Sequence, residues 1–106
     1  MREVDGMTIR LELLQRLSAI EALMGGRPLR ARPFAQIAAL RSVARAHGLI
    51  PVERLAGKLA DTLGRGEGPA TFRPWLDVLG QAIDGNATGD AEANAYIASV
   101  MVRLGA

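Results

Sequence analysis

Residues 37–66, IAALRSVARAHGLIPVERLAGKLADTLGRG, are the stretch of sequence that decides the fold. Apolar residues recur in it at steps of three and four, which places them on one face of a helix. Gly48 interrupts this pattern, and glycine readily takes the left-handed backbone that ends a helix. Pro51 fits the first turn of a second helix, whose apolar stripe is Val52, Leu55, Leu59 and Leu63. The stretch therefore predicts two amphipathic helices joined by a glycine turn.

The same spacing continues on both sides of this stretch and predicts helices at about 8–24, 33–47, 51–63 and 71–84, with a last one capped by Asp90. We expect Phe34 and Met101 on the inward faces of their helices. Gly25-Gly26, the basic segment 27–32, the glycine-rich run 64–69 and Gly85-Asn86 read as the loops and caps between them. The prediction is an all-α fold, an antiparallel four-helix bundle with one additional helix, and residues 1–106 form a single domain.

Composition supports this class and excludes several others. Of the 106 residues 49% are hydrophobic, and the chain has few aromatics and no cysteine. Ala and Leu favour helices, and the lack of cysteine excludes disulfides and thiolate zinc sites. The net charge is +2, but residues 1–50 carry eight Arg against four acidic residues. A basic surface from this half implies an acidic partner.

Neither a membrane span nor a signal peptide is expected. No apolar stretch approaches the ~20 residues that cross a bilayer. The first ten residues contain four charged side chains, at positions 2, 3, 5 and 10, instead of the apolar core of a signal peptide. We therefore expect a cytoplasmic protein that does not bind membranes.

No constellation of residues predicts catalysis. The single imidazole, His47, would have to meet Ser18, Ser42 or Ser99, and no glycine-flanked nucleophile elbow is present. The glycines at 64, 66 and 68 follow no strand and are interrupted by Pro69, so they are no dinucleotide fingerprint. We expect His47 to serve as a helix cap or a half-buried side chain. The sequence predicts no enzyme, no catalytic residue, no metal ligand and no cofactor.

Residues 37–66 resemble the centre of a histidine-containing phosphotransfer (HPt) domain. That family carries a His-x-Leu-Lys-Gly-x-Ala segment on one helix of a four-helix bundle. A glycine turn and a helix with Leu-Ala-x-x-Leu spacing follow it. Anchoring on Gly48 and on the Leu-Ala-x-x-Leu run at 55–59 aligns Leu40, Arg41, Ser42 and Ala44 with the family's Leu, Lys, Gly and Ala.

The phosphorylated histidine of the family is replaced here by Ala38. A methyl group offers no nucleophile, so the resemblance implies a degenerate HPt domain that cannot relay phosphate. Ala38 and Ser42 would form a flat spot, and Arg41 and Arg45 would present positive charge beside it. The resemblance implies that these four residues bind the receiver domain of a response regulator, or a histidine kinase, in two-component signalling.

A second resemblance covers residues 43–51, which are similar to the first helix and turn of a lactose-repressor-type helix-turn-helix. Its recognition helix needs apolar residues near positions 54, 57 and 58, where this chain has Arg54, Gly57 and Lys58. Its exposed face would also offer Glu53 and Asp61 to DNA phosphates. We therefore rank nucleic-acid binding below protein docking.

A third alternative is an unrelated helical bundle that acts by self-association. The last helix is rich in alanine, which allows two helices to approach closely. We therefore retain, as an alternative, a homodimer that forms through Ala91, Ala93, Ala95 and Ala98.

Overall fold

The computed structural model describes residues 6–24, 32–85 and 87–105. Within these ranges the chain forms five helices and no strand, which confirms the all-α prediction. The helices are α1 (Gly6–Met24), α2 (Arg32–Ala46), α3 (Ile50–Gly64), α4 (Pro69–Asp84) and α5 (Asp90–Arg103). None of them is long and apolar enough to span a membrane.

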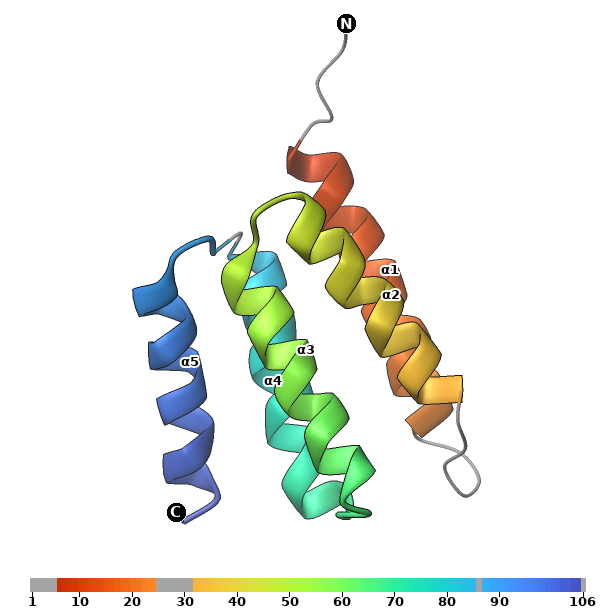
Figure 1. The fold of residues 1–106 in the computed structure, drawn as a ribbon, viewed down its shortest axis with the longest axis vertical. Coiled ribbons are helices and arrows are strands. Elements are labelled where there is room, and N and C mark those ends of the chain that lie inside the picture. The colour runs from red at the N-terminus through yellow and green to blue at the C-terminus, as the bar shows by residue number, and fades with distance from the viewer. Residues whose placement is uncertain (1–5, 25–31, 86, 106) are drawn as a thin grey trace, which may run out of the picture.

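Four of the helices close into a ring. α1 packs on α2, α2 on α3, α3 on α4, and α4 returns to α1. Successive helices run in opposite directions, with α2 in front of α1 and α3 in front of α4 in Figure 1. α5 packs on α3 and α4 at the edge, away from α1 and α2. This is the predicted antiparallel four-helix bundle with one additional helix.

The core follows the predicted apolar stripes closely. Leu55 and Leu59 of α3 are fully buried, because α2, α4 and α5 surround this helix on three sides. The apolar residues that recur at steps of three and four in α4 are all buried as well, namely Phe72, Trp75, Leu76, Leu79 and Ile83. The spacing of apolar residues at steps of three and four therefore identified the helix faces that are buried in the core.

Two predicted core residues are instead exposed. Phe34 is 39% exposed and Met101 is 42% exposed, so both predictions were wrong. The buried face of α2 begins at Pro33 and continues to Ile37, and Phe34 lies one residue, or about 100°, away from it. Met101 is offset in the same way from the fully buried Val100 of α5.

The turn between α2 and α3 has the predicted glycine geometry. Gly48 has a φ of 68°, which favours glycine, and the N–H of Leu49 donates to the carbonyl of Ala44 at 2.9 Å. His47 is exposed beside this turn rather than half-buried. The turn sets α2 and α3 side by side as antiparallel neighbours. The expected stop at Gly25-Gly26, positions 27–31 of the basic segment and Asn86 lie outside the described residues.

Candidate docking site

The four residues predicted to bind a partner lie together on the surface of α2. Ala38, Ser42 and Arg45 are exposed, and Arg41 is half-buried. They line one shallow hollow of about 200 Å³. Their steps of three and four along α2 bring them to one side of the helix. Ala38 is therefore accessible and is not covered by α1.

The charge of Arg45 is neutralised within the chain. Its Nη2 and Nε donate to one carboxylate oxygen of Glu53 in α3, at 2.6 and 2.9 Å. The Arg45 side chain remains well exposed despite this ion pair, and exposed pairs contribute about 1 kcal/mol or less. A partner carboxylate would have to compete with Glu53 for this guanidinium.

Arg41 reaches from α2 across to α3. Its Cζ and Nη2 lie 3.5 Å from the position that a Cβ on Gly57 would occupy, so the guanidinium packs against glycine backbone. Its Nε is buried and has no hydrogen-bond acceptor among the described residues. A buried donor without an acceptor costs about 1–3 kcal/mol. The Arg41 guanidinium thus packs on α3 and forms no ion pair with a carboxylate of the described residues.

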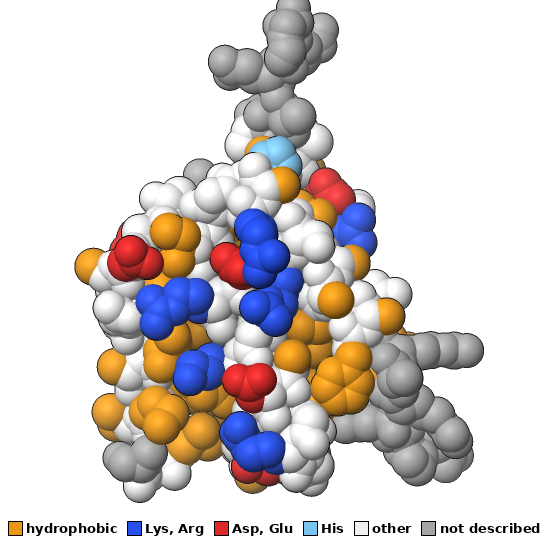
Figure 2. Space-filling view, viewed as in Figure 1, with side chains coloured by type: hydrophobic (Ala, Val, Ile, Leu, Met, Phe, Trp, Pro, Cys, Tyr) orange, Lys and Arg blue, Asp and Glu red, His pale blue; other side chains and the backbone are white. Residues whose placement is uncertain are grey.

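A second hollow of about 340 Å³ opens on the α3 side of Arg41. Its basic residues are Arg41, Arg54 and Lys58, and Gly57 lies among them. We call this the cationic hollow. Glu53 and Asp61 also line it, but the carboxylate of Glu53 is occupied by Arg45. Lys and Arg side chains gather over α2 and α3 in the view of Figure 2.

None of the three cations of the hollow forms an ion pair with another described residue. The ion pairs in the described part of the chain use other basic residues, namely Arg16 with Glu12, Arg45 with Glu53, Arg65 with Glu67 and Arg103 with Asp77. None of them involves Arg41, Arg54 or Lys58. The cationic hollow therefore holds three positive charges against the one unpaired carboxylate of Asp61, and it can attract an anionic group.

The prediction from sequence missed the contribution of α3 to this site. Arg54, Gly57 and Lys58 lie outside the apolar stripe of that helix, at steps of three and four from one another, and in the sequence they count only as evidence against a recognition helix. A glycine between two bases on one helical face was the available signal. Its meaning depends on Arg41 arriving from the neighbouring helix, which periodicity alone does not reveal.

The position of α3 also bears on the helix-turn-helix alternative. α3 packs against α2, α4 and α5, so only a narrow strip of it reaches solvent. Arg54 and Lys58 on that strip are exposed together with Asp61. The exposed strip of α3 thus carries a carboxylate beside its two bases, and a carboxylate repels DNA phosphates.

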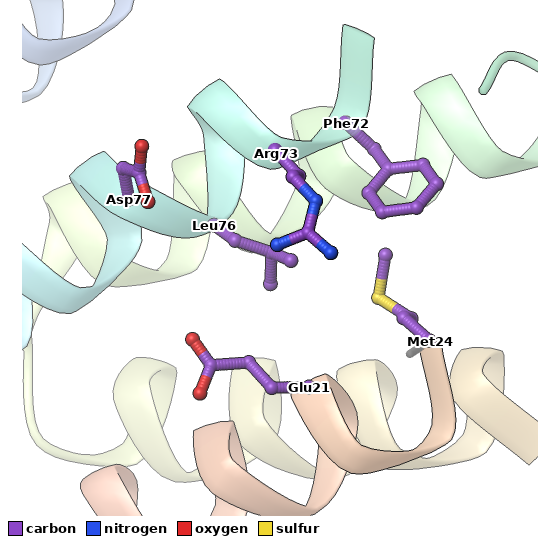
Figure 3. Close-up of a pocket in the computed structure, with 6 residues that line it drawn as sticks. All are labelled: Glu21, Met24, Phe72, Arg73, Leu76 and Asp77. Carbon is purple, nitrogen blue, oxygen red and sulfur yellow. The ribbon is translucent and has the colours of Figure 1, made fainter. Parts of the chain in front are cut away.

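A further hollow, of about 300 Å³, lies between α1 and α4 (Figure 3). Met24, Phe72 and Leu76 provide apolar contacts there, but all three are largely buried. Arg73 shares this hollow with the carboxylates of Glu21 and Asp77, so no positive charge accumulates there.

No group of three or more potential metal-ligating side chains occurs within the described ranges.

Comparison with known proteins finds no matching family model, no matching curated protein and no matching solved structure. The chemistry of the site therefore rests on its own residues. These are cations from two antiparallel helices, set around positions where side chains are small.

Proposed function

We propose that this protein is a non-catalytic docking domain that binds an acidic surface of a partner protein. We call the binding face the α2–α3 face. It comprises Ala38, Arg41, Ser42 and Arg45 of α2 together with Arg54, Gly57 and Lys58 of α3. The single observation that carries the proposal is the cluster of three cations around Gly57, none of which forms an ion pair among the described residues. Charge of one sign on a surface favours a partner of the opposite sign.

The small residues of the face support a close approach. Ala38 and Ser42 are exposed and short, and Gly57 has no side chain. Because nothing protrudes at Ala38 and Ser42, a partner backbone can come near α2, whereas Gly57 of α3 is covered by the guanidinium of Arg41. The long side chains of Arg41, Arg54 and Lys58 can then donate to its carboxylates.

The proposed partner is a response-regulator receiver domain or a histidine kinase, on the strength of the HPt resemblance. Receivers carry a cluster of carboxylates at their phosphoacceptor pocket, which suits a cationic face. The proposal includes no phosphate transfer, because the methyl group of Ala38 stands where that family has its histidine. The protein would occupy the partner without exchanging a phosphoryl group.

The test is a titration of the purified protein against receiver domains and kinases from the same cell, by calorimetry or fluorescence anisotropy. We predict that R54E combined with K58E weakens the complex by about tenfold or more, since each reversal replaces an attraction by a repulsion. The matched control is R73E, because Arg73 is also exposed and without an ion pair among the described residues, but lies in α4. R73E is predicted to leave the affinity within about twofold.

Two results would overturn the proposal. One is a loss of binding free energy in R73E of half that in the double variant or more, which would mean that overall charge and not this face is responsible, since R73E reverses one charge and the double variant two. The other is the failure of every receiver and kinase to bind, together with salt-sensitive binding to duplex DNA. That second result would establish the helix-turn-helix alternative, because phosphate contacts make binding fall steeply with salt.

A further inference from the structure

Phe34 is an exposed aromatic residue, whereas Phe72 and Trp75 are buried in the core and Tyr96 is partly buried against it. The sequence contains two Phe, one Trp and one Tyr. Phe72 and Trp75 are each 3% exposed in the core, whereas Phe34 is 39% exposed. Exposed aliphatic residues are common on protein surfaces, but an exposed aromatic ring is a preferred contact in protein interfaces.

The position of Phe34 along α2 connects it to the α2–α3 face. Residues 34, 38, 41 and 45 are separated by steps of four, three and four, and so form one stripe of the helix. Arg41 on this stripe packs against Gly57, and Arg45 bonds to Glu53, so the stripe borders α3. Phe34 therefore continues the α2–α3 face by one further turn beyond Ala38.

The spacing along the helix sets the geometry of the surface. Arg41 lies seven positions after Phe34, which corresponds to about 10 Å along the helix axis. Ala38 lies between them and is exposed and small. In the view of Figure 2, hydrophobic side chains lie beside the Lys and Arg cluster over α2. The surface thus combines an aromatic ring, a position with a small side chain and a group of cations.

We propose that Phe34 is the apolar anchor of the docking face, and that the partner is a protein surface with an apolar recess about 10 Å from a group of carboxylates. This inference rests on the proposed function and narrows it. Cations alone would suit any polyanion, but an aromatic ring on the same stripe fits an amphipathic protein surface. Aromatic and Arg side chains that become desolvated together account for most of the binding energy in many interfaces.

The two parts of such a surface respond differently to salt. Attraction between exposed charges is screened as ionic strength rises, because the Debye length falls from about 10 Å at 0.1 M to about 3 Å at 1 M. Burial of an aromatic ring is not screened in this way. The contribution of Phe34 should therefore persist at salt concentrations that suppress the contribution of Arg54 and Lys58.

The experiment measures the affinity for a receiver domain or histidine kinase that binds in the titration proposed above, at about 0.05 M and about 0.5 M NaCl. F34A is predicted to weaken binding by about tenfold at both concentrations, as expected for an interface anchor. R54E combined with K58E should weaken binding strongly at low salt and less at high salt. The matched control is V102A, because Val102 is 76% exposed but lies in α5.

A second pair of variants separates binding from folding. F34L and F34Q both replace the ring by a smaller side chain, apolar in leucine and polar in glutamine, so together they test apolar character. F34L should retain most of the affinity and F34Q should lose about as much as F34A. Thermal melts of both proteins verify that they remain folded at the temperature of the titration.

The outcomes distinguish this inference from the proposed function. If F34A and F34Q bind like V102A while the charge reversal weakens binding, Phe34 is no anchor and the docking proposal stands. If the charge reversal has no effect either, both proposals fail. Binding of single-stranded DNA that depends on Phe34 would also overturn the inference, because the ring would then stack on bases.

Discussion

Gly57 lies in the interior of α3, where a glycine lowers helix stability by about 0.5–1 kcal/mol relative to alanine. No backbone requirement explains it, since the glycines with positive φ in the described residues are Gly48, Gly66 and Gly105. What Gly57 provides is space, because the guanidinium of Arg41 lies 3.5 Å from where a Cβ would be. That distance is an ordinary van der Waals contact, so a methyl group fits without a clash.

We predict that G57A raises the free energy of unfolding by about 0.5–1 kcal/mol, measured by urea denaturation. The same substitution should weaken partner binding by about threefold or more, because the added methyl raises the floor of the cationic hollow. Effects of opposite sign on stability and binding separate a binding role from a structural one. A gain in stability with unchanged affinity would contradict the assignment of Gly57 to the face.

At the scale of single elements, α5 has a cap that differs from the expectation. Asp90 was expected to cap the helix, but the cap is Gly89 and Asp90 is the first helical residue. The carboxylate of Glu92 accepts hydrogen bonds from the N–H of Gly89 at 2.9 Å and of Thr88 at 3.0 Å. These bonds, that from Gly89 first, lower the pKa of Glu92 below its ordinary value of 4.5.

The lowered pKa gives a pH dependence with a definite sign. A depressed folded-state pKa adds stability above the unfolded pKa, and this stability is lost as the pH falls through the folded pKa. We predict that E92Q is less stable than the wild type at neutral pH. Glutamine keeps an acceptor oxygen but no charge at the helix N-terminus. Thermal melts between about pH 7 and about pH 3 should show the difference closing below about pH 4.5. A difference that stays constant over this range would contradict the prediction.

Much of each element could be predicted from the sequence, and the errors share a cause. Apolar spacing, Gly48 and the prolines at helix starts located all five helices within about two residues. The same spacing misplaced Phe34 and Met101, because one residue turns a side chain by about 100° and moves it off the buried face. Sequence also placed the α2 half of the site on one side of its helix. It could not reveal that Arg41 lies over Gly57, because that contact depends on how two helices pack.

At the scale of the whole molecule, the helices are unequally supported. α3 contacts α2, α4 and α5, whereas α5 contacts α3 and α4 only within the described residues. α5 fully buries Ala93 and Val100 but leaves its outer residues, such as Ala95 and Val102, exposed. An element with few buried apolar contacts opens locally at a lower free energy than the whole fold. Ala93 therefore belongs to the core, and Ala91, Ala95 and Ala98 remain as the accessible alanines of the helix.

The difference in packing between α3 and α5 predicts the pattern of amide hydrogen exchange. Amides of α3 should be the most protected, and those of α5 should exchange through local opening that leaves α1 and α2 intact. V100A should remove about 2 kcal/mol from the packing of α5 and reduce protection in that helix alone. L59A creates a cavity at the centre of α3 and costs about 2–5 kcal/mol, so it should reduce protection in every helix. If V100A instead lowers protection equally in α1 and α5, the five helices unfold as one cooperative unit. The docking face would then be coupled to the edge of the bundle, because any loss of packing in α5 would also lower the population of folded α2 and α3 that binds the partner.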